Sequence, residues 1–149
     1  MKRILIALLL ATQTTAFALD VEWKIAEPGW RYEFPRDHHV HTEFKTEWWY
    51  FTGNVVDDQG HRFGYELTFF RQGIMPPAGR ETGMSRFIVQ DLKFAHFAVT
   101  DVSKKQFRFE QKLSRGAFGE AGFDDGPRLA WIDDWTLATN GDDGFDLTA

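Results

Sequence analysis

Two glutamates with aromatic neighbours are the residues best suited to acid-base chemistry in this 149-residue sequence. Glu47 precedes two tryptophans and Glu66 follows Tyr65, and a carboxyl group in apolar surroundings stays protonated and can act as a general acid. An aromatic ring such as that of Trp49 can stabilise the cation that forms when an alkene is protonated. The set therefore suits the addition of water to an isolated double bond, although an ion pair with Arg71 is an equally ordinary role for either glutamate.

Two aromatic segments, 46–56 and 61–71, must position these glutamates. Apolar and polar residues alternate in both segments, and a turn rich in Asp and Gly separates them, which predicts a β-hairpin. In the register that we expect, Val56 faces His61 across the hairpin, and the pleat then sorts the residues onto two faces. Both faces of the pair carry aromatic side chains, which is typical of a strand pair covered on both sides.

The pleat of this hairpin sorts the candidate site residues by face. In the expected register Gly53 lies opposite Gly64, and paired glycines predict a sharp bend of the sheet. Glu47 and Glu66 share one face but lie roughly 13 Å apart, too far to work as a close pair. The candidate ligand contacts of the hairpin are Trp49, Phe51, Thr68, Phe70 and Arg71.

A histidine-rich run, 37–41, precedes the hairpin and is followed by Glu43. On an extended segment His39, His41 and Glu43 would share a face, and zinc accepts such nitrogen and oxygen ligands. A fourth ligand cannot be identified, so we predict no metal site and no cofactor. The imidazoles of the run are expected to pack or to line the rim of a site.

Composition excludes several other kinds of chemistry. The chain has no cysteine, which removes disulfides, thiolate metal sites and cysteine nucleophiles. It lacks the Gly-x-Ser-x-Gly pattern of serine hydrolases and any Gly-rich phosphate loop. A net charge of -5 without a cluster of Lys and Arg argues against nucleic acid as a partner.

The first residues have the three parts of a secretory signal peptide, with Lys2 and Arg3, a short apolar run and a small-residue site that ends at Ala18. We therefore expect residues 1–18 to be removed and residues 19–149 to form one periplasmic or secreted domain. The apolar run is shorter than the roughly 20 residues that a membrane span requires. The sequence stops inside a strand-like segment, which favours a fragment of a longer protein.

Period-two alternation between Gly- and Asp-rich turns predicts an all-β fold, an antiparallel meander that closes or nearly closes into a barrel. The segment from Gly73 to Ser85 has no periodic pattern and is expected to form a long loop. The expected strands are 30–34, 46–56, 61–71, 86–100, 106–113, 129–138 and 145–149.

Three runs carry a resemblance to a known family: FPRDHHVH (34–41), EWWYFTGN (47–54) and GYELTFFR (64–71). With later segments such as AHFAVTD (95–101), they resemble the lipocalin-like family of carotenoid 1,2-hydratases and kievitone hydratase. Its bacterial members are called AttH-like or predicted secreted hydrolases. The resemblance favours His38 and His41 over His39 as motif positions. His38 thus becomes a third candidate catalytic residue and His41 a further ligand contact.

The resemblance implies a lipocalin-like β-barrel that is the first of two such domains, in a chain of about twice this length. It also implies hydration of a hydrophobic isoprenoid in the hydratase branch, whereas many secreted members have no established substrate. We therefore expect an exported domain that binds a hydrophobic small molecule, a lipid or isoprenoid, with hydratase or hydrolase chemistry completed by the second domain. The alternative is a non-enzymatic envelope protein whose barrel is filled. In a filled barrel Trp49, Phe51 and Phe70 would touch one another, and in a binding barrel they would line a void.

Overall fold

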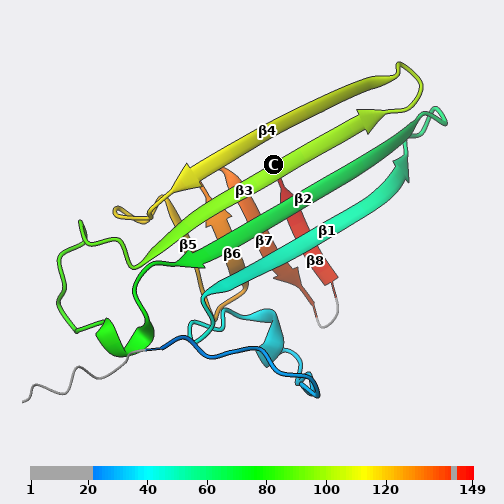
Figure 1. Ribbon diagram of the computed structural model, residues 1–149. Helices are drawn as coiled ribbons and strands as arrows, with labels where there is room; N and C mark the ends of the chain where they lie inside the picture. The colour runs from blue at the N-terminus through cyan, green and yellow to red at the C-terminus, as the bar shows by residue number, and fades with distance from the viewer. Residues whose placement is uncertain (1–21, 142–143) are drawn as a thin grey trace, which may run out of the picture.

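The computed structural model describes residues 22–141 and 144–149, so the expected signal peptide lies outside the described residues. The described chain forms two four-stranded antiparallel sheets that pack face to face (Figure 1). The first sheet contains β1 (Thr46–Val56), β2 (Arg62–Gly73), β3 (Asp91–Asp101) and β4 (Gln106–Ser114). The second contains β5 (Ala121–Phe123), β6 (Arg128–Ile132), β7 (Trp135–Asn140) and β8 (Gly144–Thr148). Two 3-10 helices, η1 (Arg36–His38) and η2 (Pro77–Gly79), complete the elements, and among the described residues no helix has the length and apolarity to cross a membrane.

The all-β class expected from the sequence is confirmed, and successive strands pair in meander order. The closed barrel is not formed, because the strand pairing found in the described residues joins β1 to β4 and β5 to β8 as two separate sheets. Strand length accounts for this difference. β4 has nine residues and β5 has three, whereas closure requires neighbouring strands to pair along their length.

Three expected strands are wrong in detail. Of the segment 86–100 only the part from Asp91 onward is a strand, β3. The segment 30–34 is not a strand, because the backbone N–H of Glu33 donates to the Asp37 side chain at 2.8 Å rather than to a neighbouring strand. The segment 129–138 is divided into β6 and β7 by a tight turn at Asp133, whose φ of 52° lies in the left-handed region. The expected loop after β2 is present and extends to the start of β3.

The register of the first hairpin differs by one residue from the expected one. Val56 pairs with Arg62, and Gly53 pairs with Tyr65 rather than with Gly64. The turn explains the shift, because Asp57 accepts hydrogen bonds from the backbone N–H of His61 at 2.8 Å and pairs with its Nδ1 at 2.8 Å. The backbone N–H of Asp57 also donates to the carbonyl oxygen of His61 at 3.0 Å, so that Asp57 rather than Val56 faces His61.

This single-residue shift exchanges the two faces of β2 relative to β1, because every side chain of β2 moves to the opposite side of the sheet. The face turned toward the second sheet, the inner face, carries Glu47, Trp49 and Phe51 of β1 with Leu67, Phe69 and Arg71 of β2. The opposite, outer face carries Trp48 and Tyr50 with Glu66, Thr68 and Phe70. The expected grouping of Glu66, Thr68 and Phe70 with Trp49 and Phe51 is therefore wrong.

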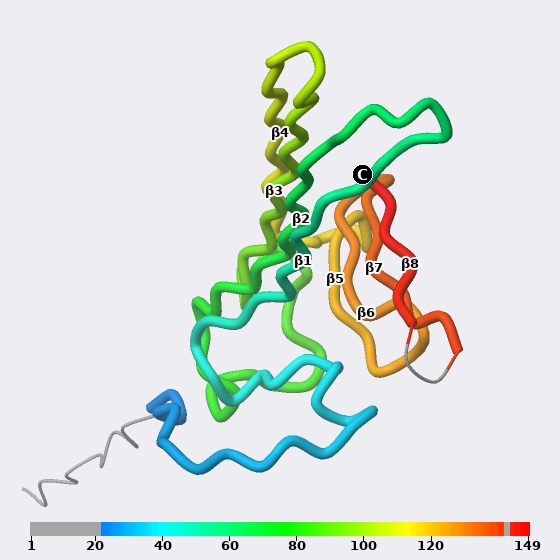
Figure 2. The backbone as a smooth tube through the Cα atoms, turned by 90° about the vertical axis from the view of Figure 1, so that its right-hand side faces the viewer, coloured from blue at the N-terminus to red at the C-terminus, as the bar shows by residue number. Residues whose placement is uncertain are grey.

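Apolar side chains fill much of the space between the two sheets. The buried members are Leu67, Phe69 and Ala95 from the first sheet and Ala121, Leu129, Ala130, Ile132, Trp135 and Leu137 from the second. The first sheet extends beyond the second, so that the β1–β2 and β3–β4 turns project past it (Figures 1 and 2). We call this end of the sandwich the open end, and the opposite end, where Glu47, Arg71 and Asp91 lie, the charged end.

Candidate functional site

Arg71 organises the charged end of the sandwich. It lies on the inner face of β2 with 1% of its side chain exposed. Its Nη1 donates to Asp91 Oδ1 at 3.0 Å, and its Nη2 donates to the carbonyl oxygens of His41, at 3.0 Å, and Phe44. Its Nε donates to Glu47 Oε2 at 3.5 Å. A buried guanidinium is tolerated where carboxylates and carbonyls surround it in this way.

His41 joins the segment before β1 to this network. Its backbone N–H donates to Glu47 Oε2 at 2.9 Å, and its ring Nδ1 lies 2.6 Å from Glu47 Oε1. Its Nε2 lies 3.4 Å from Asp37 Oδ1. Burial alone would lower the pKa of His41, but the hydrogen bond and charge of Glu47, with that of Asp37, raise it above its ordinary value.

Asp37 fixes the loop that carries His41. Its Oδ1 accepts from Arg36 Nε at 2.9 Å, and its Oδ2 accepts from the Glu33 backbone N–H at 2.8 Å and from the Trp30 indole at 3.1 Å. The Arg36 hydrogen bond, then the backbone bond, hold the pKa of Asp37 well below its usual range. The residues before β1 are therefore held to the sheet by hydrogen bonds and ion pairs in which acidic and basic side chains alternate.

The two candidate acids are separated by the first sheet. Glu47 lies on the inner face among cationic partners rather than in an apolar pocket. Glu66 lies on the outer face, where Thr68 Oγ1 donates to its Oε1 at 3.1 Å. Phe70, on that outer face, stacks on Phe94 with ring centroids 4.5 Å apart. Glu47 and Glu66 therefore cannot act on opposite ends of one substrate, and the Glu47 to Arg71 ion pair expected as the ordinary alternative is present.

Trp49, Phe51 and His38 pack between the two sheets. Trp49 stacks on Phe123 at 4.9 Å, and its Nε1 donates to the carbonyl oxygen of His38 at 2.9 Å. Phe51 meets the ring of Phe145 edge-on at 5.4 Å, and His38 meets the same ring at 5.0 Å. Trp49 and Phe51 form no single group with Phe70, which lies on the outer face, and His38 and Phe145 line a hollow of about 500 Å³ beside η1. Residues 22–141 and 144–149 bring together no cluster of three or more His, Asp or Glu that could hold a metal ion.

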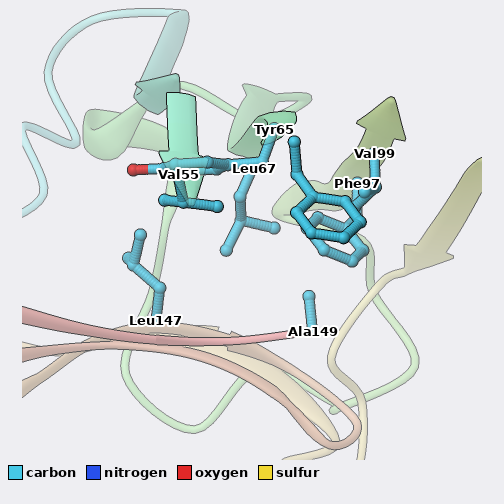
Figure 3. Close-up of a pocket in the computed structure, with 8 residues that line it drawn as sticks. Val55, Tyr65, Leu67, Phe97, Val99, Leu147 and Ala149 are labelled. Atoms are coloured by element: carbon cyan, nitrogen blue, oxygen red, sulfur yellow. The ribbon is translucent and has the colours of Figure 1, made fainter. Parts of the chain in front are cut away.

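A hollow of about 430 Å³ lies instead toward the open end, where the second sheet stops short of the first (Figure 3). Side chains of β1, β2 and β3 form one wall, and the end of the described chain at β8 forms the other. Its lining is almost entirely apolar: Val55, Phe63, Tyr65, Leu67, Phe97, Val99, Leu147 and Ala149. We call it the apolar pocket.

Tyr65 is the one lining residue whose side chain carries a polar atom. Its ring lies across β1, over Gly53, and its oxygen is held at the β1 side of the pocket (Figure 3). A Cβ atom at Gly53 would come within 2.9 Å of Tyr65 Cε1, so glycine is the residue that lets the ring lie flat there. The expected bend at Gly53 is thus a close approach of an aromatic ring.

Sequence reasoning missed the apolar pocket and Asp91. The pocket residues of β2 and β3 do alternate along the sequence, but the expected register placed Phe63, Tyr65 and Leu67 on the face away from Trp49. Asp91 stands at the first position of β3, opposite Gly73, which brings its carboxylate to the charged end beside Arg71.

The chain matches the family model described as AttH-like over residues 25–149. It belongs to the AttH-like family. A solved structure of a Nitrosomonas europaea protein designated AttH is 30% identical over 81% of this chain, with a TM-score of 0.62. That likeness and the two-sheet architecture make the fold of this AttH-like chain all-β and lipocalin-like, with sheets that do not close into a barrel. The chain spans about a third, 34%, of the length of the Nitrosomonas protein, and no curated protein matches it.

Proposed function

We propose that this AttH-like domain binds a hydrophobic small molecule, a lipid or isoprenoid, in the apolar pocket. The observation that supports this function is a hollow of about 430 Å³ lined by apolar side chains from both sheets, with one hydroxyl at its wall. Pockets for small apolar ligands have this size and this balance of apolar and polar groups. The apolar surface that such a ligand covers supplies the binding free energy.

Displacement of a neutral naphthylamine fluorophore tests this function. The protein is expected to enhance the fluorescence of the dye, and isoprenoid or fatty alcohols are expected to displace it. Val55→Trp places a large ring at the wall of the apolar pocket and should lower dye affinity about tenfold or more. Val56→Trp is the matched control, because Val56 is next in the chain, 63% exposed and on the outer face. Equal affinity in both variants would reject the apolar pocket as the binding site.

An exported location, periplasmic or secreted, is the second part of the proposal. It is supported by the signal-like segment 1–18 of the sequence. Mass spectrometry of the protein recovered from the periplasm and the medium should find an N-terminus at residue 19. Recovery of the intact segment in the cytoplasm would contradict it.

A second lipocalin-like domain is proposed as the intramolecular partner. The outer face of the first sheet supports this, because aromatic residues such as Trp48, at 60% exposed, and Phe109, at 53%, lie on it. Several exposed aromatic residues on one face form an apolar patch of the kind that another protein surface covers. The Nitrosomonas protein is also much longer than the part that this chain matches. Hydratase or hydrolase chemistry would then require groups from both domains. A protein that binds apolar dye but leaves isoprenoid alkenes and esters unchanged would favour the non-enzymatic envelope role.

A further inference from the structure

The apolar pocket is continuous with a second, polar hollow. A smaller hollow adjoins it on the β4 side and shares Phe63 and Val99 with it. The remaining lining of this smaller hollow is polar: Asp101, Lys104, Gln106 and Arg108. A molecule that fills the apolar pocket can therefore extend into a polar compartment without leaving the inner face of the first sheet.

Arg108 is the cation of this polar hollow that no carboxylate of the described residues neutralises. It pairs with Val99 across β3 and β4, so its side chain shares the inner face with Val99. Lys104 forms an ion pair with Asp101 at 3.2 Å, and Lys112 pairs with Asp133 and Asp134. In the part of the chain that the structure describes, these ion pairs leave Arg108 without a partner.

Glu110 is the nearest acid on the same face of β4. It lines a third hollow together with Arg108, Phe97 and Val99, on the side toward the charged end. No ion pair joins Glu110 to Arg108 among the described residues, whereas residues 101–106 offer no acid other than Asp101, which Lys104 already neutralises. The repulsion of an anionic group by Glu110 is therefore weakest on the side of Arg108 that faces away from it.

We infer that the ligand of this domain is an amphiphile with an anionic head, a fatty acid or a similar carboxylate, whose tail fills the apolar pocket while Arg108 binds its head. The inference rests on the proposed function, because it names the class of ligand for the same pocket. Guanidinium and carboxylate form charge-assisted hydrogen bonds in matching geometry, and because Arg108 is exposed, this ion pair forms at the solvent-facing edge of the pocket. The hydroxyl of Tyr65 lies at the opposite, β1 side and is left to contact the tail.

The test compares two probes of equal chain length, decanoic acid below its micelle concentration and decanol below its solubility limit, at about pH 8, where a carboxylic acid is ionised. Displacement of the neutral naphthylamine dye reports affinity, and native mass spectrometry reports one bound molecule. The protein should bind the acid about fivefold more tightly than the alcohol, the range of a partly exposed ion pair. Added salt should reduce this preference, because it screens the pair.

Arg108→Gln should abolish the preference for the acid while alcohol affinity stays unchanged. Arg62→Gln removes an exposed arginine from the outer face and should change neither affinity. Tyr65→Phe should leave the preference for the acid intact, since its oxygen lies on the other side of the pocket. Equal binding of acid and alcohol, or loss of the preference in Tyr65→Phe and not in Arg108→Gln, overturns the inference and leaves the apolar site standing. Failure of both probes to bind overturns the proposed function together with the inference.

Discussion

The two ends of the space between the sheets differ in character, although β1 and β2 contribute side chains to both. At the charged end, β1 and β2 contribute Glu47 and Arg71, and every polar group there is joined to another by hydrogen bonds. Toward the open end, the same two strands contribute Val55 and Phe63, and these apolar side chains surround a hollow. The contrast arises because the first sheet is longer than the second, so only part of its inner face is covered.

This contrast suggests that different residues determine the stability of the fold and the affinity for a ligand. Side chains at the charged end and in the core are interlocked, and their removal leaves buried charges or cavities. Side chains of the apolar pocket already border empty space, so their removal costs less and alters the shape of the hollow. We therefore expect substitutions at the charged end to change the free energy of unfolding and substitutions around the pocket to change ligand affinity.

Arg71→Met should have the largest effect on stability. The variant removes the buried guanidinium between Glu47 and Asp91 and frees the carbonyl oxygens of the loop before β1. Asp91 then keeps Arg80, at 2.7 Å, as a cationic partner. Loss of one partner of a buried ion pair costs about 3–5 kcal/mol. Urea unfolding followed by tryptophan fluorescence measures this loss. Arg62→Met, on the outer face, is the control and should stay within about 0.5 kcal/mol of the parent. A loss below about 1 kcal/mol in Arg71→Met would show that the charged end does not hold the sandwich together.

Leu137→Ala and Leu147→Ala compare the filled core with the pocket wall. These two leucines pair across β7 and β8, but Leu137 is 0% exposed, whereas Leu147 is half-buried and lines the apolar pocket. Leu137→Ala should lower the free energy of unfolding by about 3 kcal/mol, and Leu147→Ala by about 1 kcal/mol. Urea unfolding of the two variants side by side measures the difference. Equal losses would mean that the pocket wall is packed as tightly as the core.

The pH dependence of stability tests the role of His41. Its pKa is raised in the folded protein, so the stabilisation from its charged ring is complete below the unfolded value of about 6.5 and is lost as pH rises through the folded pKa. The stability advantage of the parent over His41→Gln should therefore be largest below about pH 6.5 and shrink as the pH is raised above that value. His39→Gln is the control, because the ion pairs of the described residues that involve histidine use His41 and His61. An advantage that stays constant across this range would show that His41 stabilises the loop without its charge.

Local pattern was enough to predict the all-β class, the meander order and most strands, because alternation and turn residues act over a few positions. Face assignment failed, since it depends on the first turn, where His61 bonds to Asp57 and therefore does not face Val56. The candidate site, too, could be predicted only where it depends on local sequence. The ion pair of Glu47 with Arg71 could be foreseen from neighbouring strands, but the apolar pocket depends on how far the second sheet extends, which no local pattern encodes.

Gly53→Ala should have the smallest effect of these variants, a change in ligand affinity at the apolar pocket. The new methyl group would come within 2.9 Å of Tyr65 Cε1, so the ring must leave β1 and move into the hollow. Because the atom that yields belongs to a movable side chain, stability should hardly change, while affinity for the naphthylamine dye should fall about threefold.

Gly64→Ala is the matched control, since its methyl group would find only Asn54 Oδ1 at 3.7 Å and Thr100 Cβ at 3.9 Å, and these residues share the outer face. Both variants add the same atom to a strand, so the same gain in strand propensity is expected for each. If they lower dye affinity equally, the effect comes from the backbone and not from the ring of Tyr65. If only Gly53→Ala lowers it, the ring that lies over this glycine sets the width of the pocket.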